Sequence, residues 1–458
     1  MKTLLNNLIS GKKVLILGFG REGQSTYHLL RKYFPEFFLT IADLDENIIA
    51  KNSFLEKDNY FETILGADYL KCISKFDIVI KSPGISLNNI DIEFNPEKIA
   101  SQTDLFLRKY HKQVIGITGT KGKSTTSSLI FEILNSFSKN TLLVGNIGIP
   151  PFDVIDKIDE STKIVCELSS HQLEFITVAP HISILLNLFQ EHLDHYKSYL
   201  DYQKAKINIL KYQSKDDFFI FHQDDELIQE FLRTNNFHSH IFSFSNSAKS
   251  EAGCFIKDNK IFFRNGNHLY EVFDKSQKIF LQGDHNFLNV MASINATILS
   301  GIPVDFIVNS IKEFKGLPHR IEFVGSFNEV DYYNDSISTI PEATIQAVKT
   351  LKNVSTLILG GHDRGIDYSV LVDFIRGSKI ENIIFIAEAG KRIFELLKSN
   401  NIQSSRFFVV ETMEEAVGIS QKETSKNMIC LLSPAAASYG MFKNFEERGD
   451  VFKKLIKN

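Results

Sequence analysis

Several features that would define a class of protein are missing from this sequence. Its 458 residues include no tryptophan, and its four cysteines form no CxxC pair. Neither a disulfide framework nor a zinc finger is indicated, and a reducing compartment fits such cysteine usage. Lysine and arginine total 51 against 55 aspartates and glutamates, which gives a formal charge of -4. The chain lacks the basic excess of a general nucleic-acid binder, although this balance is compatible with a local anion site.

Long apolar runs are also missing. No apolar segment approaches the roughly 20 residues needed to cross a bilayer. The N-terminal stretch is short and is broken by Asn6 and Asn7, which is too weak for a secretory signal. We therefore expect a cytoplasmic protein without a membrane partner. Hydrophobic residues make up 43% and charged residues 23%, as in ordinary soluble globular proteins.

Short apolar runs alternate with longer helical patterns along the whole chain. This alternation predicts an α/β fold built on mainly parallel sheets. At about 150 residues per domain, the length predicts three domains, which we place at residues 1–110, 111–316 and 317–458. We expect hairpins or loops in the polar segment 243–267. The predicted strands are 14–17, 38–42 and 77–80 in the first domain, 114–117, 141–144, 164–168, 182–188 and 218–221 in the second, and 331–333, 356–359, 382–386, 407–410 and 428–432 in the third.

A glycine-rich turn follows the first predicted strand. Gly18, Gly20 and Gly23 form a GxGxxG string, and Asp43 ends the next strand twenty residues later. Such glycines let the backbone approach a phosphate at a helix N-terminus, and the carboxylate can accept hydrogen bonds from a ribose or a base. Alone, the motif favours a dinucleotide such as NAD(P), with another nucleotide or a purely structural turn as alternatives. The loop 81–85, expected at the same sheet edge, could bind a ligand or simply end its strand.

The second glycine-rich turn is the stronger signal. The string GTKGKST begins at Gly119, after a predicted strand and before a helical pattern. It departs from the strict GxxxxGK[ST] motif, because Ile117 stands five positions before Gly122. Strand, glycine loop, lysine and hydroxyl residues nevertheless come in the expected order. Backbone N–H groups there would bind phosphates, Lys123 would reach the β- and γ-oxygens, and Ser124 or the threonine after it could bind Mg²⁺.

Acidic and imidazole side chains follow the next strands. Glu167 ends a predicted strand, where a carboxylate can hold Mg²⁺ beside phosphates, although a lone acid there is usually a turn or cap. His192 and His195 lie in a polar cluster after the strand predicted at 182–188. Loop histidines are usually ordinary hydrogen-bonding residues, so metal and structural roles both stay open from these residues alone.

Taken together, these strings resemble the Mur ligases of peptidoglycan synthesis. After the turn GFGREG in the first predicted domain, the motifs GITGTKGKST, ELSSHQLE and NLFQEHLDHY are followed by GDHNFLN, GLPHR, NDS and SPAAAS in the second and third. The resemblance is to the members that add glutamate to UDP-N-acetylmuramoyl-L-alanine. It implies an ATP-dependent amide ligase that works through an acyl phosphate and releases ADP and phosphate. It also implies a Rossmann-like UDP-binding domain, a central P-loop ATPase-like domain, and a Rossmann-like C-terminal domain that binds glutamate and closes.

The resemblance assigns roles to individual residues. For catalysis it implies Lys123, Glu167, His192 and Lys206, and for two Mg²⁺ ions it implies Ser124, Glu167, His192 and Lys206. ATP would contact Gly119, Thr120, Lys121, Gly122, Lys123, Ser124, Thr125, Asn286, Asn289, Arg320 and Asp335. The UDP substrate would contact Gly18, Gly20, Arg21, Glu22, Gly23, Asp43, Ser82, Gly84, Asn146 and Ser169, which replaces the NAD(P) interpretation of the first motif. Glutamate would contact Thr339, Arg364, Ser438 and Phe445.

The roles of Lys206 and His192 follow from the resemblance and not from the residues alone. Lys206 matches the lysine that the family carbamylates with CO₂; without the resemblance it would be an ordinary helix-surface lysine. A carbamate turns a cationic amine into an anion with two oxygens, which suits a Mg²⁺ site. His192 could act as a general base, but the resemblance favours a role at the metal.

The sequence departs from the D-glutamate-adding pattern at two places. That pattern has a lysine two residues after the aspartate of the Asn-Asp-Ser motif, where this chain has Ile337, and another lysine in a later glycine loop, where it has Arg364. Arginine can bind a carboxylate, but not with the geometry of lysine. The runs NDSIST and HDRG resemble variant ligases that add L-glutamate to the same acceptor and depend on a separate epimerase. D-glutamate is the family default, and L-glutamate is the alternative.

Other functions share part of these features. A folylpolyglutamate-type ligase has the same kind of P-loop and metal site but lacks a UDP-binding first domain. A sugar-nucleotide-binding protein without activity would need no set of Lys123, Glu167, His192 and Lys206, and a dehydrogenase would bind NAD(P). We expect a monomer whose partners are small molecules, with no nucleic acid among them.

Overall fold

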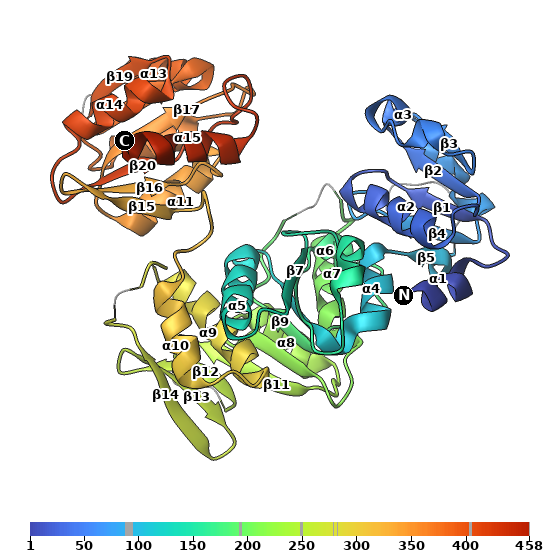
Figure 1. The fold of residues 1–458 in the computed structure, drawn as a ribbon. Helices are drawn as coiled ribbons and strands as arrows, with labels where there is room; N and C mark the ends of the chain where they lie inside the picture. The colour runs from blue at the N-terminus through green and yellow to red at the C-terminus, as the bar shows by residue number, and fades with distance from the viewer. Residues whose placement is uncertain are drawn as a thin grey trace. The chain divides into compact units, whose positions relative to one another are not determined.

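The structure is a computed structural model that describes residues 1–87, 95–191, 195–247, 251–277, 279–281, 283–402 and 405–457. Helices and strands alternate along the chain and form three sheets (Figure 1). The chain divides into two compact units, one of Met1–Lys278 with His285–Ile311, the other of Ile279–Asp284 with Lys312–Asn458. The first predicted domain and most of the second lie within the first unit, whereas residues 279–284 and 312–316 of the second belong to the other unit. The predicted α/β class with mainly parallel sheets is confirmed.

The first sheet has five parallel strands in the order β3-β2-β1-β4-β5. The strands are β1 (Val14–Leu17), β2 (Leu39–Asp43), β3 (Phe61–Leu65), β4 (Ile78–Lys81) and β5 (Ile99–Ala100), and the helices of this part are α1 (Lys2–Ile9), α2 (Arg21–Tyr33), α3 (Ile48–Lys51) and α4 (Gln102–Tyr110). All four residues of β1, Val-Leu-Ile-Leu, are buried, as expected for a central strand covered on both faces. The first glycine-rich turn joins the end of β1 to the start of α2.

The second sheet has nine strands in the order β14-β13-β12-β11-β10-β9-β6-β8-β7. Its strands are β6 (Val114–Thr118), β7 (Thr141–Gly145), β8 (Lys163–Glu167), β9 (Ile182–Leu185), β10 (Phe218–His222), β11 (His240–Ser245), β12 (Gly253–Lys257), β13 (Lys260–Asn265) and β14 (His268–Asp274). The helices are α5 (Lys123–Phe137), α6 (Ser170–Leu173), α7 (Tyr199–Lys211), α8 (Glu226–Thr234), α9 (Asp284–Leu299) and α10 (Val304–Glu313). The hairpins expected at 243–267 are present as the antiparallel pairs β12–β13 and β13–β14, and they extend the parallel sheet at its edge.

The third sheet forms the second unit, with strands in the order β15-β16-β20-β17-β18-β19. Its strands are β15 (Glu322–Phe327), β16 (Val330–Asn334), β17 (Val354–Gly360), β18 (Asn382–Ile386), β19 (Arg406–Val410) and β20 (Ile429–Leu432). The helices are α11 (Pro341–Leu351), α12 (Ser369–Arg376), α13 (Ala387–Ser399), α14 (Met413–Glu423) and α15 (Phe445–Lys457). Only β15 and β16 run antiparallel to each other. The central β17 is buried throughout.

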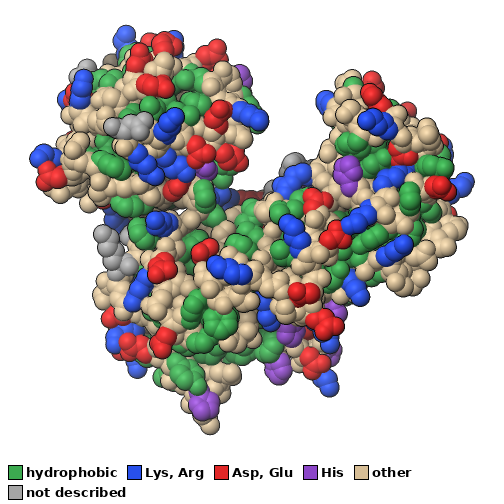
Figure 2. All heavy atoms as spheres, in the orientation of Figure 1, with side chains coloured by type: hydrophobic (Ala, Val, Ile, Leu, Met, Phe, Trp, Pro, Cys, Tyr) green, Lys and Arg blue, Asp and Glu red, His purple; other side chains and the backbone are tan. Residues whose placement is uncertain are grey.

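The two units have separate hydrophobic cores. In the first unit one cluster of buried side chains joins the first sheet, through residues such as Ile16 and Ile41, to the second, through Val144 and Phe219. In the second unit the two faces of the third sheet carry clusters of their own. On the face drawn in Figure 2, basic and acidic side chains are interspersed, in keeping with the near balance of charge in the sequence. Among the described residues, no helix is long and apolar enough to span a membrane.

Candidate active site

Strand β6 leads into the second glycine-rich turn, and α5 begins directly after it. Gly122 is the N-cap residue of α5 and has a φ of 86°. A Cβ at this position would lie 2.4 Å from Asn289 Oδ1, so both the backbone conformation and the space require glycine. The N–H groups in the first turn of a helix lack intrahelical acceptors and favour a bound anion. The turn therefore has the geometry of a phosphate site.

Two lysine side chains converge on this turn. Lys123 Nζ donates to the carbonyl oxygens of Gly119 and Thr120 at 2.9 Å and 3.0 Å. Lys206 Nζ, from α7, donates to the same Gly119 oxygen at 2.8 Å. The structure thus places the predicted catalytic lysines, which are 83 positions apart in the sequence, at one carbonyl oxygen.

Lys206 is buried, with 2% of its surface exposed. Its Nζ lies 3.4 Å from Thr118 Oγ1 and 5.1 Å from the centre of the Tyr202 ring. Burial, and then the positive charge of Lys123, lower the pKa of Lys206 well below its usual value. The interpretation from the residue alone, a helix-surface lysine, is wrong. The surroundings favour an uncharged amine, which is the nucleophilic form of lysine.

Glu167 ends β8 beside the same turn. Strand β8 pairs with β6, with Glu167 opposite Ile117. Its carboxylate is fully buried, and its Oε1 accepts a hydrogen bond of 2.7 Å from Asn146 Nδ2. Within the described part of the chain, its Oε2 is buried and has no hydrogen-bond partner. Because a buried acceptor is costly to leave unsatisfied, this oxygen is suited to a cation.

Two asparagines of α9 lie against the phosphate turn. Thr126 Oγ1, on α5, is 3.3 Å from Asn289 Oδ1, although the two residues are 163 positions apart. Asn289 Nδ2 donates to Asn286 Oδ1 at 3.2 Å. The structure therefore brings Asn289 to the turn and holds Asn286 beside Asn289.

Two further residues support the turn and had no predicted role. Asn187, after β9, accepts from the backbone N–H of Lys121 at 2.8 Å and donates to its carbonyl oxygen at 3.0 Å. The Tyr202 hydroxyl lies 2.8 Å from Thr120 Oγ1. The position of Asn187 at a strand end was the one signal in the sequence that could have identified it. His192 lies outside the described residues.

The first glycine-rich turn is held by the two residues that the sequence placed near it. The backbone N–H of Phe19 donates to Asp43 Oδ2 at 2.6 Å. Ser82 Oγ donates to the carbonyl oxygen of Gly18 at 2.7 Å. A Cβ at Gly23 would lie 2.1 Å from that same Gly18 oxygen, so glycine is required there. The turn thus brings together Gly18, Gly23, Asp43 and Ser82. The space around Gly20 and Gly84 does not require glycine, because a Cβ at either position would meet nothing within 4 Å among the described atoms.

Arg21 and Glu22 connect this turn to the second sheet. Arg21 Nη2 donates to the carbonyl oxygen of Gly148 at 2.6 Å, in the loop that also carries Asn146. Glu22 Oε1 accepts a hydrogen bond of 2.7 Å from Gln172 Nε2 on α6. Ser169, the N-cap residue of α6, lies directly before that helix. All the predicted UDP-site segments therefore occur in the first unit at the edges from which the two glycine turns leave their sheets.

In the second unit, Asp335 follows β16 and is 2% exposed. Its Oδ2 accepts a hydrogen bond of 2.7 Å from Ser433 Oγ, and its Oδ1 accepts one of 3.2 Å from the backbone N–H of Ile321. Burial raises the pKa of Asp335 to about 6, against the opposing effect of these hydrogen bonds and of the Arg320 charge. Arg320 is exposed next to it.

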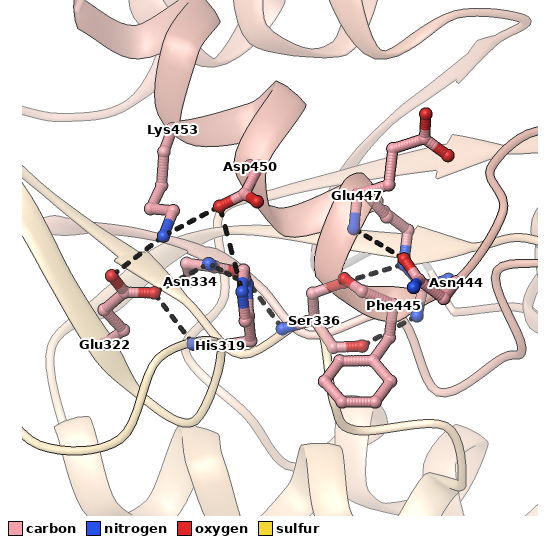
Figure 3. A network of polar contacts seen from close by, with 10 residues as sticks. His319, Glu322, Asn334, Ser336, Asn444, Phe445, Glu447, Asp450 and Lys453 are labelled. Atoms are coloured by element: carbon pink, nitrogen blue, oxygen red, sulfur yellow. Dashed lines mark hydrogen bonds and ion pairs between the residues drawn. The ribbon is translucent and has the colours of Figure 1, made fainter.

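A polar network holds the loop that carries Arg320 (Figure 3). Glu322 Oε2 accepts hydrogen bonds from the backbone N–H of His319 at 2.8 Å and from Asn334 Nδ2 at 3.0 Å. Asn334 Nδ2 is also 3.0 Å from His319 Nδ1. Because His319 precedes Arg320 and Asn334 precedes Asp335, this network fixes both predicted nucleotide contacts of the second unit.

The predicted glutamate-binding residues belong to segments that are linked by hydrogen bonds. Arg364 Nη2 donates to the carbonyl oxygen of Thr339 at 3.0 Å, and Ser336 Oγ donates to that of Phe445 at 2.8 Å. Arg448, which the sequence did not identify, is 2% exposed. Its guanidinium donates to Ser336 Oγ at 2.9 Å, and to the carbonyl oxygens of Ala436 and Ala437, next to Ser438, at 3.0 Å and 3.1 Å.

Comparison with known proteins agrees with this arrangement. Residues 117–297 match the family model described as the Mur ligase middle domain. A UDP-N-acetylmuramoylalanine–D-glutamate ligase of Thermoanaerobacter sp. (strain X514) is 32% identical over 452 residues, covering 98% of each chain. One of Lachnoclostridium phytofermentans is 33% identical over 457 residues, covering 97% of this chain and 98% of the relative.

This chain belongs to the Mur ligase family.

The fold of this Mur ligase is also found in solved structures. UDP-N-acetylmuramate-alanine ligase MurC from Thermotoga maritima aligns with a TM-score of 0.55 at 18% identity, covering 97% of this chain and 99% of that one. The MurF ligase from Thermotoga maritima in complex with ADP aligns with a TM-score of 0.57 at 14% identity, covering 92% and 96%. At these identities the likeness shows the fold. The predicted family, the α/β architecture and the class of enzyme, a ligase, are confirmed.

Membership in this family implies ATP and Mg²⁺, and the residues at the phosphate turn fit them. Proteins usually hold Mg²⁺ with one or two carboxylates, water and substrate phosphates rather than with a complete protein cage. Glu167 Oε2 is a buried oxygen that has no donor among the described residues, and the Ser124 hydroxyl lies in the first turn of α5. Among the described residues, no group of three or more His, Cys, Asp or Glu side chains could hold a metal alone. The Glu167 carboxylate and the Ser124 hydroxyl fit an ion that binds together with nucleotide phosphates.

Proposed function

We propose that this Mur ligase joins glutamate to the alanyl carboxyl group of UDP-N-acetylmuramoyl-L-alanine at the expense of ATP. The full-length relatives are named for this reaction with D-glutamate. The observation that carries the proposal is the convergence of Lys123 and Lys206 on the turn after β6, where β8 presents the buried carboxylate of Glu167 opposite Ile117. A non-catalytic sugar-nucleotide-binding protein would not need this set.

The proposed reaction begins with phosphate transfer from ATP. The turn 119–122 and the first turn of α5 bind the phosphates through backbone N–H groups, and Lys123 leaves its carbonyl partners to bind the γ-phosphate. Ser124 and Glu167 would hold Mg²⁺, which would further neutralise the phosphate charge. The carboxylate of the acceptor then attacks the γ-phosphorus, the bond from this phosphorus to the β,γ-bridging oxygen breaks, and ADP leaves as the acyl phosphate forms. Phosphoryl transfer depends mainly on such positioning and charge stabilisation.

The second step forms the amide. The amine of glutamate attacks the activated carbonyl carbon, and the tetrahedral adduct expels phosphate. We propose that Thr339, Arg364, Ser438 and Phe445 bind glutamate, and that Arg320 and Asp335 contact the nucleotide. The hydrogen bonds that link these segments within the second unit support this assignment.

We further propose that Lys206 is carbamylated. Its uncharged amine would add to CO₂, forming an N–C bond and releasing a proton, and the product would be an anion next to Glu167. The burial of the amine and the lowered pKa support this step. The resulting oxygens, with His192, would complete the ligands for a second Mg²⁺.

The first glycine turn, with Asp43, Ser82, Asn146 and Ser169, is proposed to bind the UDP substrate. The Asp43 carboxylate accepts the backbone N–H groups of Phe19 and Asp45 and thereby shapes the turn. We propose a cytoplasmic monomer that acts on small molecules. The four cysteines, all buried free thiols, fit a reducing compartment.

The glutamate substrate can be the D- or the L-enantiomer. D-glutamate is the default from the relatives, and L-glutamate is favoured by Ile337 and Arg364. Arg364 Nη2 donates to the Thr339 carbonyl oxygen, so the guanidinium lies beside one of the proposed glutamate-binding residues. A planar guanidinium binds a carboxylate in a geometry that lysine does not share.

The test is phosphate release by the purified protein with ATP, Mg²⁺, bicarbonate and UDP-N-acetylmuramoyl-L-alanine, run separately with D- and L-glutamate. Product mass confirms amide formation, and a Lys123→Ala variant serves as the inactive control. Turnover with D-glutamate alone supports the default, and turnover with L-glutamate alone supports the variant pathway and an epimerase that follows it. No turnover with either enantiomer contradicts the proposed function.

A further inference from the structure

The side chain of Gln172 is hydrogen-bonded in two directions. It is 2% exposed and is the third residue of the short helix α6. Its Oε1 accepts the backbone N–H of Ser169 at 3.0 Å, and Ser169 Oγ accepts the backbone N–H of Gln172 at 3.2 Å. This reciprocal pair is a capping box. The other end of the amide, Nε2, donates to Glu22 Oε1 at 2.7 Å.

Glu22 is the partner from the first glycine turn. It is the second residue of α2, directly after Gly20 and Arg21 in the GxGxxG string. Its Oε2 is buried and has no hydrogen-bond partner among the described residues, and Gln102 Nε2 donates to its backbone oxygen at 3.2 Å. A carboxylate would repel a diphosphate, so the side chain is unsuited to a direct contact with the phosphates of the substrate. Its observed partner is Gln172 instead.

The chemistry of this contact explains why residue 172 is glutamine. A capping box is equally satisfied by glutamate at this position. Of glutamine and ionised glutamate, however, only glutamine can accept from Ser169 at one end and donate to a carboxylate at the other. Glutamate at position 172 would place two carboxylates against each other in a buried setting. The residue type therefore follows from Glu22, which is 150 positions away.

We propose that the Gln172–Glu22 pair positions the acceptor substrate for the reaction. It fixes the glycine turn, which is proposed to bind UDP, against Ser169, which lies two residues after Glu167. The pair would thus set the distance between the anchored nucleotide end of the substrate and its reacting carboxylate. This inference rests on the proposed function, and both residues act as positioning residues that do not touch the reacting atoms.

Exchange of the two side chains provides the test. Gln172→Glu alone should lower kcat/KM for UDP-N-acetylmuramoyl-L-alanine about tenfold or more, since contacting groups couple on this scale. The KM for ATP should change by less than about twofold, because the phosphate turn has its own support. The double variant Glu22→Gln with Gln172→Glu restores both the capping box and the bridge, with donor and acceptor exchanged. It should recover to within about threefold of the wild type.

A control isolates the bridge from the cap. Helix α14 has a capping box of Thr412 and Glu415 in the second unit. Glu415→Gln makes the same kind of change there without a bridge and should leave kcat/KM unchanged. Thermal unfolding of every variant identifies any loss of activity that comes from loss of fold.

The outcomes separate this inference from the proposed function. If the wild type turns over but Gln172→Glu keeps its kcat/KM, the positioning role is wrong while the function stands. If the double variant is no better than Gln172→Glu, Glu22 acts on the substrate directly and the inference is again wrong. If the wild type shows no turnover with either glutamate, the proposed function fails and this inference fails with it.

Discussion

The lysine on α7 illustrates how burial changes the chemistry of a residue. Lys204 and Lys206 are two positions apart on the same helix, yet the first is exposed and the second is buried against the phosphate turn. Helix periodicity separates the faces of these two lysines and places Lys206 with the buried Tyr202 and Leu210, but it does not show what covers that face. The resemblance to the family identified Lys206 as the lysine to be carbamylated. Its burial beside the phosphate turn is consistent with that role.

This contrast gives a matched prediction. With ¹³C-labelled bicarbonate, the protein should show one carbamate carbon signal, and Lys206→Gln should abolish it. The variant should also lose at least about 100-fold in phosphate release, the scale for removing one charge-stabilising group. Lys204→Gln should keep the signal and the activity. A carbamate signal that persists in Lys206→Gln would contradict the assignment.

Asp335 provides a prediction about pH. Burial raises its pKa to about 6 from 3.8, so the folded state holds this proton more tightly than the unfolded state. The stability contribution of the protonated group is therefore complete below about pH 3.8 and is lost as pH rises through about 6. Between these limits the loss amounts to about 3 kcal/mol. A group that opposes folding at neutral pH is typical of binding sites.

Asp335→Asn removes this titration. We expect the free energy of unfolding of the variant, measured relative to the wild type by urea at a series of pH values, to rise by up to about 3 kcal/mol from pH 4 to pH 7. The same substitution should impair nucleotide-dependent phosphate release at every pH. A difference in stability that stays constant over this pH range would contradict the shifted pKa.

At the scale of elements, the sequence predicted the strongly apolar strands well, including the edge strands β7 and β19, but it missed the edge strands β3, β5 and β15 and the interior strand β11. The bounds of β1 and β18 match the prediction, because each is a run of apolar residues between polar turns. The edge strand β3 is only partly buried, and β5 has two residues, so neither gave a clear pattern. Contacts such as Gln172 with Glu22 depend on how two sheets pack, which local periodicity does not encode.

Helix α15 provides a test of close packing. A Cβ at Gly449 would lie 2.1 Å from His319 Nδ1 and 2.8 Å from Asn334 Nδ2, inside the network of Figure 3. Gly449→Ala should therefore destabilise the second unit by about 1–3 kcal/mol, the usual cost of overpacking. It should also weaken phosphate release, because the displaced loop carries Arg320.

Gly418, in α14, is the matched control. A Cβ there meets nothing within 4 Å among the described atoms. Gly418→Ala should leave stability unchanged or raise it by up to about 1 kcal/mol, since alanine has the higher helix propensity. Denaturant unfolding of both variants measures the contrast. Equal effects at the two glycines would show that α15 does not pack as described.

At the scale of the whole molecule, the sequence predicted three sheets but not how they share cores. The motifs identify turns and strand ends, and most of the candidate residues lie at such turns and strand ends. They do not show that the first two sheets share one hydrophobic cluster while the third has clusters of its own. Such sharing depends on which buried faces meet, a property of side chains far apart in the sequence.

The shared core leads to a prediction about unfolding. Because cooperativity follows a common core, we expect two thermal transitions, one for each unit, rather than three. UDP-N-acetylmuramoyl-L-alanine should stabilise only the first unit. At a hundredfold excess over its Kd, the free energy of unfolding of that unit should rise by about 2.7 kcal/mol. Gly449→Ala should lower only the unfolding temperature of the other transition, which identifies that transition as the unfolding of the second unit. Calorimetry with and without the substrate measures both effects. Three transitions would show that the first two sheets unfold separately despite their common cluster, and a single transition moved by both changes would show that the two cores are energetically coupled.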